Sequence, residues 1–118
     1  NVITVAATDR SGGKASYSNT GSVVKIAAPG GDFGDSGSAV LSTLNAGFST
    51  PGADNYVEYL GTSMAAPHVA GVAALLLSIQ PGRTPAKVLE RLQKSARPFP
   101  AECVGCGTGI VDAAAALR

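Results

Sequence analysis

Residues 63–79 form the segment that most constrains what this chain can fold into. They are mostly alanine, valine and leucine, and Pro81 and Gly82 mark where a helix would end. A helix that is apolar on nearly every side is normally buried on every side. We therefore predict a central helix packed all round, with Gly71 and the alanines letting strands approach its backbone closely.

Two short apolar runs predict strands of a parallel sheet. Residues 2–7 form a continuous apolar run, which is typical of a strand buried on both faces beneath covering helices. Residues 23–28 predict a second strand, which Pro29 and the glycines after it would end. A strand buried on both faces needs neighbours on both edges, and this chain supplies few. We therefore expect part of the sheet to lie outside the chain.

The remaining elements complete a prediction of one α/β domain. Residues 39–44 and 55–60 alternate well enough for two strands, and the polar, glycine-bearing segment between them suits a hairpin. Residues 85–96 predict a helix that Thr84 would cap, and residues 111–117 predict a short final helix. Internal repeats and interdomain linkers are absent from the sequence.

Composition excludes several classes of function. Hydrophobic residues make up 45% of the chain and charged residues 14%, which indicates a globular protein rather than a disordered one. The net charge is +1 and the basic residues are scattered, so we expect no nucleic-acid partner. The apolar run at residues 69–77 is about half of what a membrane span needs, so we expect no membrane partner. The chain starts at Asn1 without a visible signal peptide, as a processed or trimmed product would.

Residues 61–71 read GTSMAAPHVAG, and this segment resembles the nucleophile motif of the subtilases, the family of subtilisin and proteinase K. The resemblance extends upstream through VITVAATDRSGGKASYSNTGSVVKIAAPG and downstream through CGTGIVDAAAAL. It covers essentially the whole chain but less than half of a subtilase catalytic domain. It implies a three-layer α/β fold with a mainly parallel sheet, and a secreted serine endopeptidase of peptidase family S8, most like bacterial members.

The resemblance makes Ser63 the catalytic nucleophile. A serine at the start of a buried helix lies among free backbone N–H groups, which stabilise the oxyanion formed when it attacks a carbonyl. Gly61 would leave room for the substrate backbone, and Thr62 would add a weak hydroxyl donor. A lone serine before an apolar helix is more simply explained as a helix cap, but the surrounding motif reverses that preference.

His68 is the single histidine of the chain, yet it is a poor candidate for the catalytic base. Five residues along a helix separate two side chains by roughly 140° and about 7.5 Å of rise, so His68 and Ser63 cannot easily share a hydrogen bond. We expect His68 to be a hydrogen-bonded histidine on the buried side of the helix. The resemblance agrees, because the catalytic histidine of subtilases lies in an earlier segment.

The chain order of the subtilisin triad is Asp, His, Ser. The resemblance therefore implies that residues 1–118 are the C-terminal part of one catalytic domain, and that the acid, the base and an oxyanion asparagine precede residue 1. Asp9 and Asp54 are expected to be turn residues. In subtilisin itself, loss of the base lowers turnover by a factor on the order of 10⁶, so we expect the isolated chain to be inactive. Its expected partners are the preceding part of the domain, a peptide or protein substrate, and a propeptide or protein inhibitor.

Cys103 and Cys106 form a lone CxxC. A zinc site would need two more ligands, and only His68 is left. A redox site would open a helix after a strand, whereas prolines and glycines surround these cysteines. We favour a disulfide, with two free buried thiols as the alternative. Some secreted bacterial subtilases have such a disulfide.

We expect no catalytic cofactor, although the resemblance implies that the full domain can bind structural calcium. Near residues 23–26 some family members carry acidic ligands, where this chain has Val23 and Lys25. Asp32 and Asp35 could offer oxygen ligands, but two carboxylates more simply indicate a solvated loop. No metal site is therefore assigned, and the loop at residues 30–38 is left without a role.

Two other interpretations are possible. The nucleophile elbow of an α/β-hydrolase needs a glycine two residues after the serine, and Ala65 stands there. A non-catalytic α/β binding or assembly module would use residues 61–71 for packing alone. That module would fold by itself, and Ser63→Ala would change nothing in it.

Overall fold

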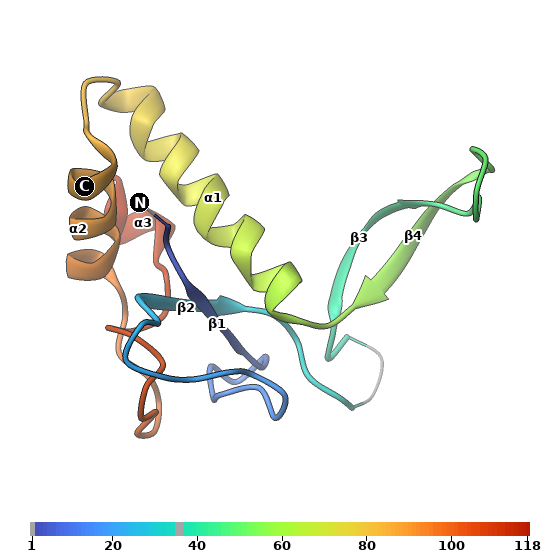
Figure 1. The fold of residues 1–118 in the computed structure, drawn as a ribbon, viewed down its shortest axis with the longest axis horizontal. Helices are drawn as coiled ribbons and strands as arrows, with labels where there is room; N and C mark the ends of the chain where they lie inside the picture. The colour runs from blue at the N-terminus through green and yellow to red at the C-terminus, as the bar shows by residue number, and fades with distance from the viewer. Residues whose placement is uncertain (1, 35–36) are drawn as a thin grey trace.

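The computed structural model describes residues 2–34 and 37–118. Figure 1 shows a body in which strands and helices pack together, with a separate hairpin that projects from it. The elements in chain order are β1 (Val5–Thr8), β2 (Ile26–Pro29), β3 (Val40–Asn45), β4 (Asp54–Tyr59), α1 (Thr62–Ile79), α2 (Pro85–Ser95) and α3 (Ala113–Ala116).

Strands β1 and β2 pair in parallel, with Val5 opposite Ile26, as the apolar runs predict. Both faces of β1 are covered. Ala7 packs into the cluster around α1, while Ala6 packs with Ala27 and Cys106 on the other face. Each strand begins three residues later than predicted, because Val2 and Val23 are apolar but exposed and lie outside the ladder.

The composition of α1 predicts burial on every side, and this prediction is wrong for the described residues. Only one stripe is buried, at the spacing of a helix that packs on one side: Ala65, Val69, Val72 and Leu76. A methyl group added at Gly71 would meet no atom within 4 Å among the described residues, so no strand approaches there. The rest of α1 is largely exposed apolar surface.

By length and composition alone, α1 would be long enough to cross a membrane. The continuous apolar run at residues 69–77, on which the sequence-based expectation rested, is too short to suggest a membrane span. Core helices of soluble proteins share the property, and the buried stripe of α1 packs against β1 and β2.

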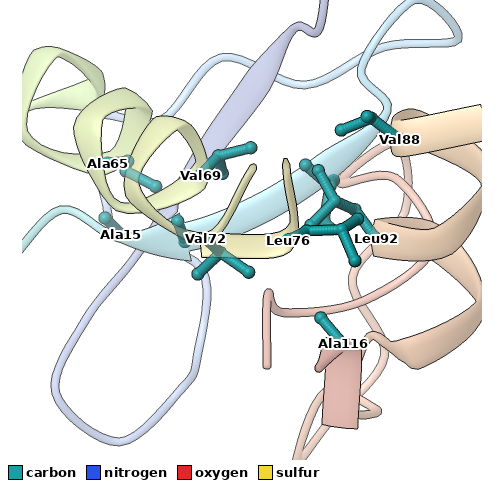
Figure 2. Packing of buried hydrophobic residues seen from close by; sticks show 11 residues of the cluster. Ala15, Ala65, Val69, Val72, Leu76, Val88, Leu92 and Ala116 are labelled. Carbon is teal, nitrogen blue, oxygen red and sulfur yellow. The ribbon is translucent and has the colours of Figure 1, made fainter. Parts of the chain in front are cut away.

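The core lies between α1, the sheet and helix α2. Figure 2 shows Leu76 of α1 and Leu92 of α2 side by side, with Val88 and Ala116 close to them. Helix α2 begins as predicted, because the Thr84 hydroxyl accepts a hydrogen bond from the backbone N–H of Lys87. Helix α3 is shorter than predicted and is capped by the Asp112 carboxylate, which accepts from the N–H of Ala115.

Strands β3 and β4 form the predicted antiparallel hairpin, with Val40 opposite Tyr59 and Asn45 opposite Asp54. Asp54 therefore opens β4 and is not a turn residue. Figure 1 shows the hairpin joined to the body near the N-terminus of α1, with its tip directed away from the core. Residue 35 lies outside the described residues, and so does the expectation that Asp35 could bind an ion.

Candidate active site

The N-terminus of α1 starts from a glycine whose backbone no other residue adopts comfortably. Gly61 is the N-cap, with φ 153° and ψ 162°, and its carbonyl accepts the N–H groups of Met64 and Ala65 at 2.9 and 3.2 Å. Positive φ of this kind favours glycine strongly. The first N–H groups of the helix, those of Thr62 and Ser63, lie before the helical ladder begins.

Ser63 lies in the first turn of α1 and is exposed. The helix has no side-chain cap hydrogen bond, so the interpretation of Ser63 as a helix cap is wrong. Its hydroxyl lies in the first turn, where the helix dipole favours negative charge. Ser63 also lines a hollow of roughly 340 Å³ between α1 and β3, together with Met64, Pro67, His68 and residues 40–42.

Gly30 sets the position of this helix start relative to the sheet. The N–H of Gly61 donates to the carbonyl of Gly30 at 2.9 Å. A methyl group at residue 30 would lie 2.6 Å from the Cβ of Ala7 and 2.8 Å from the carbonyl oxygen of Gly61. Only glycine lets the end of β2 and the start of α1 approach this closely.

Tyr17 reinforces the same junction. Its hydroxyl lies 2.8 Å from the carbonyl oxygen of Gly30 and 2.7 Å from that of Gly31, so it can donate to either. Burial raises the pKa of Tyr17, the backbone N–H of Gly61 partly offsets this, and the charge of Asp32 adds to it. Sequence reasoning missed Gly30 and Tyr17, although the glycines after Pro29 were a signal that backbone approaches closely there.

His68 lies on an exposed part of α1, and its Nδ1 is 2.8 Å from the carbonyl oxygen of Met64. The expectation that His68 lies on the buried side of the helix is wrong in the described structure, because the stripe of α1 that faces the core passes through Ala65 and Val69. The expectation of a hydrogen-bonded ring is met. Its Nδ1 interacts with backbone one turn earlier.

Comparison with known proteins decides the family. The family model described as "Subtilase family" matches residues 1–112. This chain belongs to the subtilase family. An extracellular protease of Xanthomonas campestris pv. campestris is 53% identical to it over 99% of the chain, and subtilisin E of Bacillus subtilis is 38% identical over 98%. The match excludes an α/β-hydrolase.

Solved structures give the same result for the fold of this subtilase chain. A protease of Pseudoalteromonas arctica superposes with a TM-score of 0.92 at 53% identity, covering 98% of the chain and 35% of that protein. Fervidolysin of Fervidobacterium pennivorans, described as a keratinolytic enzyme related to subtilisin, superposes with a TM-score of 0.80 at 34% identity over 98% of the chain and 19% of that protein. The predicted subtilisin-like α/β fold is confirmed.

The subtilase chain spans only part of the proteins it matches. It covers 19% of the Xanthomonas protease and 26% of subtilisin E. It also covers 19% of an extracellular basic protease of Dichelobacter nodosus, to which it is 41% identical over 100% of the chain. What those whole proteins do is therefore a matter for proposal in this chain.

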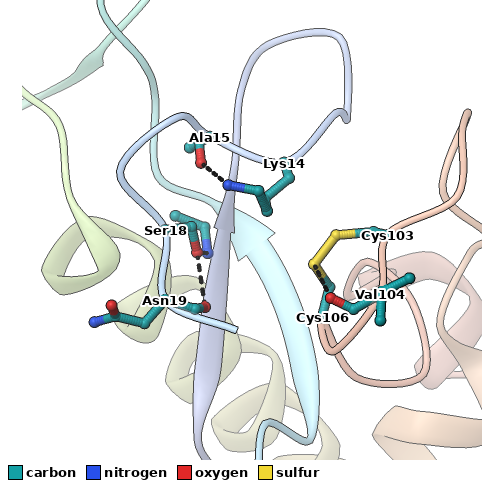
Figure 3. Close-up of a disulfide and its surroundings, with 8 residues drawn as sticks. Lys14, Ala15, Ser18, Asn19, Cys103, Val104 and Cys106 are labelled. Carbon is teal, nitrogen blue, oxygen red and sulfur yellow. Dashed lines mark hydrogen bonds between the residues drawn. A yellow bond between two sulfur atoms is a disulfide. The ribbon is translucent and has the colours of Figure 1, made fainter. Parts of the chain in front are cut away.

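A disulfide joins Cys103 and Cys106 of the subtilase chain, with 5.6 Å between their Cα atoms. Figure 3 shows the bond beside the two-stranded sheet, where Cys106 is buried against Ala6 and Ala27. The carbonyl of Gly105, between the two cysteines, accepts the N–H of Gly21 at 2.8 Å. The bridge therefore holds a loop that covers the sheet face opposite α1.

The carboxylates near the sheet are engaged by the protein itself. Asp32 accepts hydrogen bonds from the hydroxyl and the N–H of Ser16, each at 2.6 Å, and from the N–H of Phe33 at 2.8 Å. These donors hold the pKa of Asp32 below its ordinary value, the Ser16 hydroxyl most of all. Asp9 is the predicted turn residue, and its Oδ1 accepts from the N–H of Ser11.

Across the described part of the chain, no group of three or more His, Cys, Asp or Glu could hold a metal ion.

Proposed function

We propose that this chain carries the nucleophile of a subtilisin-like serine endopeptidase, and that the nucleophile is Ser63. The observation that carries the proposal is the position of Ser63: it is exposed in the first turn of α1 and lines a hollow. The N-cap of the helix is Gly61, whose backbone conformation favours glycine. Membership of the subtilase family and the named proteases among its relatives support it.

In this mechanism the Ser63 Oγ attacks the carbonyl carbon of a peptide bond and gives its proton to a histidine base. The oxyanion that forms lies close to the backbone N–H of Ser63 and to the positive end of α1, and both stabilise it. Gly61 leaves room for the substrate backbone, and Thr62 offers a hydroxyl donor. The amine leaves with the proton returned by the base, and water then hydrolyses the acyl-enzyme in the same way.

We propose further that residues 1–118 are the C-terminal part of one peptidase S8 catalytic domain, called the complete domain below. The catalytic acid, the base and one oxyanion donor then come from residues that precede this chain, and the chain alone is inactive. The triad order Asp, His, Ser of subtilisin supports an acid and a base that precede Ser63 in the sequence. The contact of His68 Nδ1 with the carbonyl of Met64 supports a base other than His68.

The complete domain is, in this proposal, secreted and acts on peptide or protein substrates. Two relatives are named extracellular proteases, which supports secretion. A solved relative, MycP1, is described with its N-terminal propeptide removed, which supports a propeptide as a partner. The chemistry needs no cofactor. Structural calcium is proposed for the complete domain from the family resemblance alone, and no site for it is assigned among the described residues.

A pair of serine substitutions on one helix tests the role of Ser63. In the complete domain, Ser63→Ala should lower kcat for a peptide substrate by a factor on the order of 10⁶. Ser78→Ala is the matched control, since Ser78 is exposed on α1 and its hydroxyl donates only to the carbonyl of Leu75. It should change kcat by less than about twofold. Retained activity in Ser63→Ala would refute the proposal and favour a packing role for residues 61–71.

A substitution of His68 tests where the base lies. His68→Gln keeps a hydrogen-bonding side chain on α1 but cannot act as a general base. If the base lies outside this chain, the variant keeps its activity within about tenfold and its pH–rate profile keeps the same acidic limb. Loss of that limb in His68→Gln would assign the base to this chain.

A further inference from the structure

The tip of the β3–β4 hairpin presents a fully exposed aromatic side chain. Phe48 lies between the two strands, and it is the most exposed of the large hydrophobic residues among those described. Aromatic side chains are favoured at recognition surfaces because they bury a large apolar area with few rotatable bonds. An isolated exposed apolar residue would need no explanation, so the structure around Phe48 decides what it means.

The tip that carries Phe48 is held by its own hydrogen bonds. The Asn45 Oδ1 accepts the N–H of Gly47 at 3.0 Å and that of Gly52 at 2.7 Å, while its Nδ2 donates to the carbonyl of Gly52 at 2.9 Å. The N–H of Ala46 donates to the carbonyl of Ala53 at 2.8 Å. The tip is therefore shaped before any partner arrives, which lowers the entropy lost on binding.

One face of the hairpin is apolar from its base toward its tip. Residues directly opposite in an antiparallel pair share a face, and so do residues two apart on one strand. The register therefore places four apolar residues on a single face, with Ser42 and Asn55 between them: Val40, Leu44, Val57 and Tyr59.

This apolar face is continuous with the hollow beside the nucleophile. Val40 and Ser42 of that face line the hollow together with Ser63, and Leu41 of the opposite face lines it as well. The C-terminal end of the hairpin, β4, also leads directly into Gly61 at the start of α1. A polypeptide that left Ser63 along this face would meet the base of the hairpin first and its tip last.

We propose that the hairpin is an exosite for extended polypeptide substrates, in which Phe48 binds an apolar side chain remote from the scissile bond. The proposal rests on Ser63 being the nucleophile. Strand β3 has six residues, so it carries the tip about 20 Å from its base. An extended substrate covers that distance with about six residues, so the anchored side chain lies about six or more residues from the bond that is cut. The preferred substrates are therefore unfolded or extended proteins, and short peptides cannot reach the tip.

The test compares substrates of different reach on the complete domain. Three are used: a four-residue chromogenic peptide, a 20-residue quenched fluorescent peptide with apolar residues six to eight positions from the scissile bond on both sides, and the same long peptide with serines at those positions. Phe48→Ser should lower kcat/KM roughly five- to tenfold on the apolar long peptide and leave the other two substrates within about twofold. Phe48→Leu should restore most of the loss.

A matched control and the parent enzyme keep the outcomes distinct. Val104 is an exposed apolar residue next to the disulfide, so Val104→Ser should leave all three substrates unchanged. An unchanged rate of Phe48→Ser on the apolar long peptide overturns the exosite while leaving the protease intact. If the unsubstituted complete domain cleaves none of the three peptides, the proposed function is overturned, and the exosite with it.

Other occupants of the tip would give different results. If another part of the same protein covers Phe48, Phe48→Ser lowers the melting temperature and the rates on all three substrates together. If a second copy of the chain covers it, Phe48→Ser changes the molar mass measured by sedimentation at micromolar concentration. Either result overturns the exosite.

Discussion

On one side of the N-terminus of α1 lies a packed core, where Leu76 of α1 and Leu92 of α2 have no exposed surface. On the other side lies the β3–β4 hairpin, where Leu41 is 62% exposed and Phe48 is fully exposed. Both regions are rich in apolar residues, so composition alone does not distinguish them. The difference teaches that burial decides what an apolar residue does. A buried apolar residue stabilises the first region, whereas an exposed one in the second region is free to contact other molecules.

The largest effect should come from removing apolar volume in the packed core, and the same change in the hairpin should have almost none. Leu92→Ala removes a fully buried side chain and should lower the free energy of unfolding by about 2–5 kcal/mol. Leu41→Ala, in the exposed hairpin, should change it by less than about 0.5 kcal/mol. Urea unfolding of the complete domain in a Ser63→Ala background, which prevents self-digestion, measures both. Equal losses would show that the hairpin is as much a part of the core as α2.

The second prediction concerns the junction between the two regions. Gly30→Ala places a methyl group 2.6 Å from the Cβ of Ala7, which should lower the free energy of unfolding by about 3 kcal/mol. Because the carbonyl of Gly30 holds the N–H of Gly61, a shift of about 1 Å would reach Ser63 and lower kcat/KM on the order of 100-fold. Gly82→Ala is the control, since a methyl there meets no described atom within 4 Å. If kcat/KM of Gly30→Ala equals that of the unsubstituted domain, the contact between Gly30 and Gly61 does not position Ser63.

A smaller effect is expected from Tyr17→Phe, which removes the hydroxyl that bonds to Gly30 and Gly31. The loss should be about 1 kcal/mol of unfolding free energy at neutral pH. Since burial raises the pKa of Tyr17, the contribution of its neutral form is present below pH about 10 and is lost as pH rises through the pKa in the folded state. Thermal melts from pH 8 to 12 should therefore fall less steeply for Tyr17→Phe. A parallel fall in both proteins would assign the alkaline loss elsewhere.

The smallest effect concerns Asp32, which anchors the loop that leads toward the hairpin. Its pKa is lowered chiefly by the Ser16 hydroxyl, so its contribution is present above pH about 4 and is lost as pH falls through the pKa in the folded state. Asp32→Asn should make the melting temperature less dependent on pH below pH 4. Ser16→Ala should do the same in part, because it removes the strongest donor. An unchanged acid profile in both variants would show that this loop does not couple to folding.

Local chemistry explains which elements the sequence predicts well. Helix α2 starts where predicted because Thr84 and Pro85 act within one turn of the chain. The hairpin is recovered because alternation and turn residues are local as well. Strand starts are placed too early, since Val2 and Val23 are apolar yet lie at the surface. Nothing in a short apolar run says which of its residues will be paired.

Long-range packing explains what the sequence leaves out. The apolar character of α1 predicts burial on every side, but burial depends on which neighbours are present, and those described cover one stripe. His68 is exposed for the same reason. The support of the nucleophile by Gly30 and Tyr17 depends on three segments far apart in the chain, which no local pattern reveals. The position of Ser63, by contrast, follows from one continuous motif.

The most direct test of the central claim is labelling with a fluorophosphonate, followed by peptide mass spectrometry to locate the adduct. The reagent reacts only with a serine whose hydroxyl is activated by a nearby base. In the complete domain we predict a single adduct on Ser63, and in residues 1–118 alone we predict none. An adduct on another serine of the complete domain, or on Ser63 of the isolated chain, would contradict the account.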